Sequence, residues 1–100
     1  MKTTHYLDAV KSRYSFVSDY KLADKLGITR ASVSVLRNSK GFLGEDTSIF
    51  IGQLLEINPL IIISTANAER AARAGHEKQF IMWSDLAKKL SIEAGLQPVD

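Results

Sequence analysis

The sequence predicts an all-helical protein, and three observations support that fold class. Apolar residues recur at three- and four-residue steps along most of the chain, which is the spacing of one helix face. Glycine, asparagine and proline separate these segments where helices would end or begin. No segment alternates apolar and polar residues as a half-buried strand would. With 100 residues, of which 45% are hydrophobic, the chain is long enough to enclose one compact core.

Three predicted helices occupy the N-terminal part of the chain. The first covers about residues 4–14, where tyrosine, leucine and valine repeat at helical spacing. Ser18 is the predicted N-cap of the second helix, since its hydroxyl can accept a backbone hydrogen bond. Gly27 ends that helix, because glycine adopts the left-handed conformation without a steric penalty. Thr29 is then the predicted N-cap of a third helix over about residues 30–38.

Three more helices are predicted after a loop of turn-forming residues at 38–44, whose phenylalanine and leucine are expected to pin it to the core. The fourth helix begins at about residue 46 or 47 and ends at about residue 56. The fifth covers about residues 59–73 and begins with a proline, which suits a first helical turn. An Ala-Gly pair breaks the chain at residues 74–75. The sixth helix follows over about residues 77–94.

Charge is distributed unevenly along the chain. Residues 1–40 hold eight Lys or Arg and three Asp, a net charge of +5, whereas residues 41–100 hold five basic and eight acidic residues, a net charge of −3. A basic segment joined to an acidic one indicates that the first meets a polyanion such as nucleic acid. A chance scatter of charges over a solvated surface is the alternative.

Several classes of function are not expected. The chain has no cysteine, which excludes disulfides, thiolate metal sites and thiol catalysis. Neither His5 nor His76 lies at a metal-ligand spacing, and the serines of the third helix and its loop have no adjacent histidine. No catalytic residue, metal site, cofactor or small-molecule ligand is therefore expected. The most apolar stretch, residues 59–63, is too short to span a membrane, and residues 1–8 lack the apolar block of a secretory signal. These features favour a cytoplasmic protein that is not an enzyme.

The segment from Asp19 to Asn38 has the pattern of a helix-turn-helix. Ala23 is small enough to let its two helices cross closely, and Gly27 supplies the turn between them. Apolar positions from Gly27 onward would pack the later helix of this motif on the earlier one: Ile28, Val33 and Leu36. The remaining positions of the later helix are short or basic, which suits the base edges and phosphates of a major groove. A plain helical hairpin is the alternative.

This pattern, with one helix before it and at least two after it, resembles the DNA-binding domain of the lambda repressor and Cro family over about residues 4–72. The whole chain also resembles small helix-turn-helix proteins of filamentous phages and prophages. That second likeness lies in the apolar stretch 54–63, the Ala/Arg segment 66–74 and the tryptophan of the last helix. The resemblance implies a five-helix, lambda-repressor-like DNA-binding domain with an extra C-terminal helix, divided at residue 75 into residues 1–75 and 76–100.

The resemblance also implies roles for individual residues. Arg30 and Ala31 match the start of the recognition helix, where family members read bases, and Ser34 faces the same groove one turn later. Asn38 matches a position that often touches a phosphate. The predicted DNA-binding residues are Lys21, Thr29, Arg30, Ala31, Ser34, Arg37, Asn38 and Lys40.

The chain departs from the family at Asp19. Family members often carry glutamine there, where it supports the base-reading residue, and an acidic side chain would not face a phosphate comfortably. Either that contact is missing, or Asp19 favours the positive end of its helix. Lys21 is a candidate to replace the lost contact.

These features predict a transcriptional regulator, a phage or prophage repressor, that binds double-stranded DNA as a homodimer and acts by occupying its operator. The predicted dimer interface is a stripe on the last helix: Phe80, Trp83, Ala87 and Leu90. One alternative packs that helix on its own core, and another places the dimer seam around residues 60–63. The alternative function is a helical interaction module of a mobile element that binds a host or phage protein through its acidic half.

Overall fold

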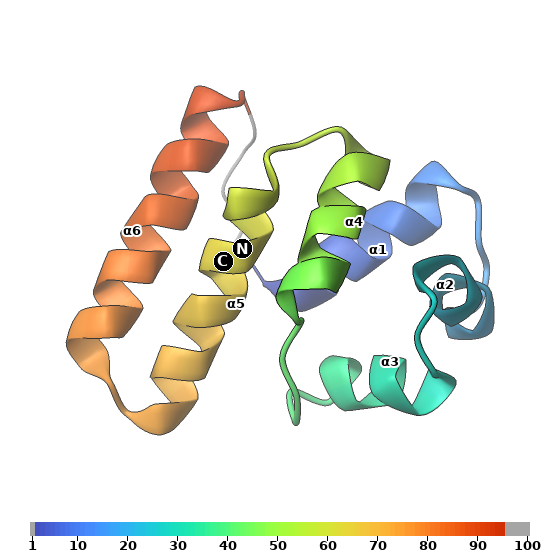
Figure 1. The fold of residues 1–100 in the computed structure, drawn as a ribbon, viewed down its shortest axis with the longest axis horizontal. Coiled ribbons are helices and arrows are strands. Elements are labelled where there is room, and N and C mark those ends of the chain that lie inside the picture. Colours follow the sequence, from blue (N-terminus) through green and yellow to red (C-terminus); the bar gives the residue numbers. More distant parts are fainter. Residues whose placement is uncertain (1, 96–100) are drawn as a thin grey trace.

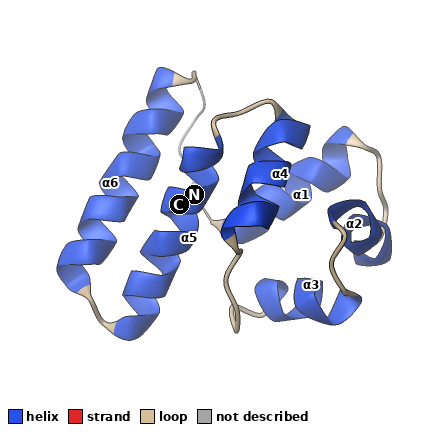
Figure 2. Cartoon of the chain, in the orientation of Figure 1, coloured by secondary structure: helices blue, strands red, loops and turns tan. Residues whose placement is uncertain are grey.

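The computed structural model describes residues 2–95, and all of the regular secondary structure in that range is helical (Figure 2). The all-α fold class predicted from the sequence is therefore confirmed. The described range contains six helices: α1 (Thr3–Arg13), α2 (Asp19–Leu26), α3 (Arg30–Arg37), α4 (Glu45–Leu55), α5 (Pro59–Ala74) and α6 (Glu77–Glu93). Within residues 2–95, none of these helices has both the length and the apolar character needed to cross a bilayer.

The helices surround one apolar core, with α2 and α3 at one end of the molecule and α6 at the other (Figure 1). The core takes side chains from α1 to α5 and from the loop before α4. Its largest fully buried members are Leu7, Leu22, Ile51, Ile61 and Ile62. α5 is the central element, because it contacts α1 and α4 on one side and α6 on the other.

The helix boundaries follow the capping residues that the sequence predicts. Ser18 and Thr29 accept hydrogen bonds from backbone N–H groups three residues on, at 3.3 and 3.0 Å, and so begin α2 and α3. Gly27 and Gly75 end α2 and α5 with φ of +68° and +75°, the left-handed conformation that glycine favours. α4 begins at Glu45, one or two residues earlier than its expected start at residue 46 or 47.

α6 folds back along α5, which is the only described helix that it contacts (Figure 1). Ala87 is buried in this pair, and Leu90 packs on the main core. Trp83 is half-buried, and Phe80 is 40% exposed. Most of the stripe predicted to pair with a second copy therefore lies against the chain's own α5, as in the alternative reading of the sequence. A dimer through this stripe stays a prediction, and only its Phe80 end is open.

Candidate nucleic-acid interface

The α2–α3 pair is joined by a turn with three residues between the helices. At Gly27 the backbone has φ +68° and ψ 28°, and the N–H of Ile28 donates to the carbonyl of Ala23 at 3.1 Å. A Cβ added at Gly27 would meet no atom within 4 Å, so the need for glycine here is conformational. Val33 and Leu36 of α3 are buried with the apolar face of α2. The inner faces of the two helices are thus fixed against the core, and the opposite face of α3 is left to solvent.

The outward face of α3 is polar, small and free of acidic residues. Arg30, Ala31 and Ser34 are exposed along it, as predicted. Val35 shares this face and is 41% exposed. Such a surface offers hydrogen-bonding groups beside methyl groups. A major groove carries the matching features, which are the donors and acceptors of base edges and the methyl group of thymine.

Two of the predicted DNA-binding residues, Thr29 and Asn38, are the N-cap and C-cap of α3. The Thr29 hydroxyl lies 2.9 Å from that of Ser32 and also accepts from the Ser32 N–H. The Asn38 side-chain amide donates to the carbonyl of Ser34 at 2.8 Å. Both side chains are exposed, so they lie at the surface of the candidate interface while also holding the helix termini.

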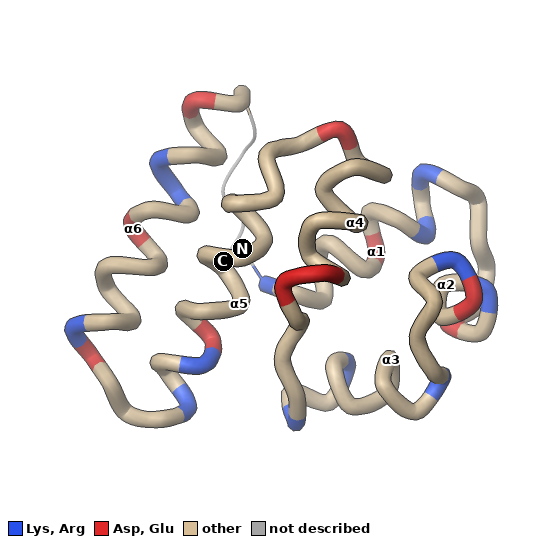
Figure 3. Tube along the Cα trace, viewed as in Figure 1, with Lys and Arg blue, Asp and Glu red and all other residues tan. Residues whose placement is uncertain are grey.

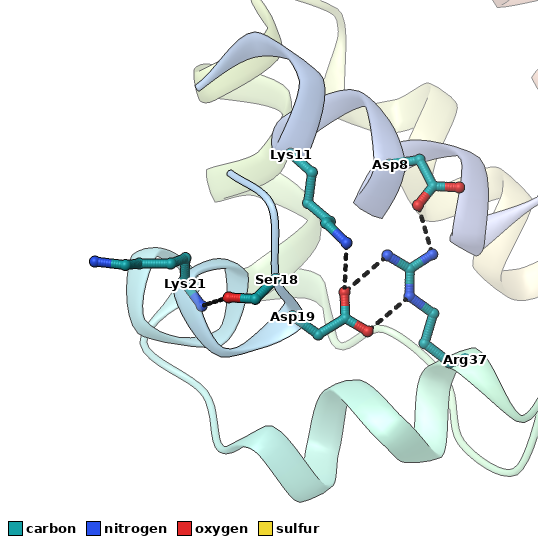
Figure 4. A network of polar contacts seen from close by, with 6 residues as sticks. All are labelled: Asp8, Lys11, Ser18, Asp19, Lys21 and Arg37. Atoms are coloured by element: carbon teal, nitrogen blue, oxygen red, sulfur yellow. Dashed lines mark hydrogen bonds and ion pairs between the residues drawn. The ribbon is translucent and has the colours of Figure 1, made fainter. Parts of the chain in front are cut away.

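Arg37 is placed differently from the prediction, because its guanidinium points into a network of acidic side chains (Figure 4). Its Nη1 lies 2.6 Å from Asp8 of α1, and its Nη2 and Nε lie 3.0 and 3.3 Å from the two carboxylate oxygens of Asp19. Lys11 adds a further contact, with its Nζ 3.2 Å from Asp19. The Arg37 side chain is only 22% exposed. Arg37 therefore links α3 to both α1 and α2.

The network favours the ionised forms of Asp19 and Arg37. Hydrogen bonds from Arg37, and secondarily from Lys11, hold the pKa of Asp19 below its ordinary value of 3.8, although burial acts in the opposite direction. Burial by itself would lower the pKa of Arg37, but the hydrogen bonds to Asp19 and Asp8 outweigh it and raise that pKa. The departure at Asp19 thus has a structural explanation, since its carboxylate binds two cations of the same chain.

Three exposed cations surround α3 without an ion pair among residues 2–95: Lys21, Arg30 and Lys40. Figure 4 shows the Lys21 side chain extending away from the Asp19 network. Lys40 follows α3 in a loop whose start is held by a 2.9 Å hydrogen bond from the Lys40 N–H to the carbonyl of Val35. Figure 3 shows basic residues at both ends of α3 and on α2. These cations are free to meet an anionic ligand.

The loop between α3 and α4 is fixed from the side of α5. Two arginine side chains lie over the Phe42 ring. The guanidinium carbons of Arg73 and Arg70 are 3.9 and 5.2 Å from its centroid. Arg70 also donates to the carbonyl of Leu43 at 3.0 Å. Leu43 itself is buried in the core, so the expected pinning to the core is confirmed for Leu43, whereas Phe42 contacts the arginines of α5 instead. This anchoring limits where Lys40 can lie.

Tyr20 is a further member of the candidate interface, and sequence reasoning did not identify it. It is the second residue of α2, its side chain is 58% exposed, and its ring centroid lies 5.3 Å from the guanidinium carbon of Arg30. Tyr20 lies off the buried face that Leu22 and Leu26 define. An aromatic residue outside the apolar stripe was the only available signal.

Within residues 2–95, no group of three His, Asp or Glu side chains could hold a metal ion. A hollow of about 590 Å³ lies along α5 and α6 and also reaches Lys2 and Ser39. It is open to solvent and carries both charges, and its lining includes Glu69, Arg73, Phe80, Ile81, Asp85 and Lys88.

Comparison with protein-family models, with curated proteins and with solved structures found no match for this chain. The structural class that can be stated is an all-helical protein with an exposed, acid-free helix face at the end of the molecule opposite α6.

Proposed function

We propose that the chain is a sequence-specific DNA-binding regulator in which α2 and α3 form a helix-turn-helix and α3 enters the major groove. The observation that carries the proposal is the outward face of α3, which has Arg30, Ala31 and Ser34 along it and no acidic side chain. Free cations, Lys21 and Lys40, flank this face. The likeness of the sequence to the lambda repressor and Cro family supports the same arrangement.

Each side chain of the interface has a distinct task in this proposal. Arg30 donates two hydrogen bonds to a guanine, and Ser34 hydrogen-bonds a base edge one turn later. Ala31 and Val35 present methyl groups that suit the 5-methyl group of thymine. Lys21 and Lys40 bind phosphates on either side of α3 and so fix its register.

Arg37 is not counted among the phosphate contacts. Three of its nitrogen atoms already lie within 3.3 Å of Asp8 or Asp19, so a phosphate would have to displace a carboxylate of the same chain. The geometry supports a role in which Arg37 holds α3 at a fixed angle to α1 and α2. In that role it supports recognition without touching DNA.

The chain acts as a homodimer in this proposal, because one helix-turn-helix covers only half of an operator. Two copies would bind half-sites about 10 base pairs, or one DNA turn, apart and exclude polymerase by occupancy. The resemblance to proteins of phages and prophages favours a repressor of that origin.

The proposal is tested by footprinting the full-length protein on the DNA upstream of its own coding sequence. We expect protection of two half-sites separated by about one helical turn. Selection of sites from a randomised duplex pool should return the same half-site sequence. A protein that protects no region and enriches no sequence from the pool contradicts the proposal.

A second candidate function is an interaction module that binds another protein through the α5–α6 side. The observation that favours it is the exposure of Ile81 and Met82, both apolar and both about half exposed on α6. Absence of binding to every duplex at low salt would favour this candidate, because the electrostatic attraction of a DNA-binding protein is strongest there.

A further inference from the structure

The two arginines of α3 have partners of opposite kinds. Arg37 is held by carboxylates, which contact each of its three guanidinium nitrogens. Arg30 instead lies over the face of the Tyr20 ring, with 5.3 Å between its guanidinium carbon and the ring centroid. No ion pair of Arg30 is present among residues 2–95. The only described partner of its guanidinium is therefore an aromatic ring.

This difference matters for recognition of a base. A ring face attracts the guanidinium through its negative electrostatic potential, but it uses none of the N–H groups at the edge of the guanidinium plane. Those donors stay available for the two parallel hydrogen bonds that a guanine accepts. A long arginine side chain that is already restricted also loses less conformational freedom on binding.

Asp19, which precedes Tyr20 in α2, is not available to position Arg30. Asp19 binds Lys11 and Arg37 with its two carboxylate oxygens. Tyr20, one position later and 58% exposed, is on the open side of α2.

We infer that Tyr20 is a positioning residue for base recognition: its ring holds the Arg30 guanidinium in place while leaving the N–H donors of Arg30 free for a guanine. This inference rests on the proposed function. It adds to it the residue on which the specificity of Arg30 depends.

The test compares Tyr20→Leu, which removes the ring, with Tyr20→Phe, which keeps it. The matched control is Tyr14→Leu, because Tyr14 is another exposed tyrosine with a cation over its ring, Lys25 at 4.7 Å, and it lies at the C-cap of α1. The first readout needs no DNA. In the full-length protein, NMR should show the side-chain δ protons of Arg30 shifted by the Tyr20 ring current, and the shift should disappear in Tyr20→Leu and persist in Tyr20→Phe.

The second readout is discrimination at the base pair where Arg30→Ala relaxes the preference of the protein. Tyr20→Leu should reduce that discrimination roughly two- to fivefold, as the strength of an exposed cation–π contact implies. Tyr20→Phe and Tyr14→Leu should keep it. In an Arg30→Ala background, Tyr20→Leu should have no further effect at that pair, since the group it positions is gone.

The outcomes separate this inference from the function on which it rests. A missing ring-current shift, or unchanged discrimination in Tyr20→Leu, overturns the role of Tyr20 while the DNA binding of the parent protein stands. An equal loss in Tyr20→Phe and Tyr20→Leu overturns it too, because the hydroxyl and not the ring would then be responsible. Failure of the parent protein to bind any duplex overturns the proposed function and this role together.

Discussion

Arg30 and Arg37 stand at opposite ends of α3 and differ in what surrounds them. Arg30 is exposed and stacked on a ring, whereas Arg37 is mostly covered and bound by Asp8 and Asp19. The sequence alone made both candidates for DNA contact, because a helical pattern shows which positions share a face but not which other helix comes near. The position of α1 beside α3 brings Asp8 to Arg37, and that position depends on how the whole core packs.

Replacing Arg30 tests base recognition directly. Arg30→Ala should cost about 1–3 kcal/mol of discrimination at one base pair, because a bidentate contact to guanine is lost. The measurement is the affinity for the selected operator and for single-base variants of it. Equal losses on the selected operator and on random DNA would show that Arg30 contacts only phosphate.

The ion-pair network predicts a particular response to acid. The folded-state pKa of Asp19 is lowered, so its contribution to the free energy of unfolding is present above its ordinary pKa and is lost as the pH falls through the folded value. The parent protein should therefore lose stability below about pH 4 more steeply than Asp19→Asn. Because the Asp19 side chain is 42% exposed, we expect the difference to stay within about 1 kcal/mol.

Urea unfolding at neutral and acidic pH measures this response. Asp24→Asn is the matched control, since Asp24 is an exposed acid on the same helix and has no ion pair among residues 2–95. It should keep the acid dependence of the parent. An Asp19→Asn variant with the same acid dependence as the parent would mean that the network does not stabilise the fold.

At the scale of elements, much of the fold could be predicted because the signals are local. Ser18, Thr29 and Gly27 act through hydrogen bonds and backbone angles within a few residues, and each occupies the role expected of it. The placement of α6 could not be predicted in this way. An amphipathic stripe indicates that a helix buries one face, but the same stripe fits a second copy or the chain's own α5 equally well.

Packing of α3 on α2 is tested by truncating one buried side chain. Leu36 is 8% exposed at this contact, so Leu36→Ala should lower the free energy of unfolding by about 2–5 kcal/mol. Val35→Ala is the control on the same helix and should change stability by no more than about 0.5 kcal/mol, because Val35 faces solvent. Similar values for the two variants in chemical denaturation would place the wrong face of α3 inward.

The turn between α2 and α3 depends on a backbone conformation rather than on space. Gly27→Ala should destabilise the protein by about 1–2 kcal/mol, because a residue with a Cβ is strained at φ +68° even where no neighbour is close. Gly27→Asn should lose less, since asparagine tolerates the left-handed region better. Thermal unfolding of the three proteins measures the order, and equal stability of Gly27→Ala and the parent would contradict it.

At the scale of the whole molecule, the charge asymmetry of the sequence is only partly available to a ligand. Lys11 and Arg37 bind acids within the N-terminal segment, and Arg13 binds Glu56 of the second half at 2.6 Å. The other bases of the first half have no ion pair among residues 2–95, and three of them, Lys21, Arg30 and Lys40, surround α3. These three lie at the surface that we propose meets DNA.

The proposed homodimer is a property of the whole molecule. Sedimentation of the full-length protein with a two-half-site duplex should give two chains per duplex, because each helix-turn-helix covers one half-site. A duplex with a single half-site should bind much more weakly. One chain per two-half-site duplex, at the same affinity as for a single half-site, would show that the protein acts as a monomer.

The most direct test of the central claim is the salt dependence of duplex binding by the parent protein and by the double variant Lys21→Gln, Lys40→Gln. For each phosphate neutralised, the logarithm of the affinity should fall with the logarithm of salt concentration by a slope of about −0.9. We predict a steep slope for the parent and one that is flatter by about two units in the double variant. The control variant Lys78→Gln, Lys89→Gln, whose exposed lysines lie on α6, should keep the parental slope. Duplex binding that is absent at low salt, or whose slope is the same in all three proteins, would contradict the proposed interface around α3.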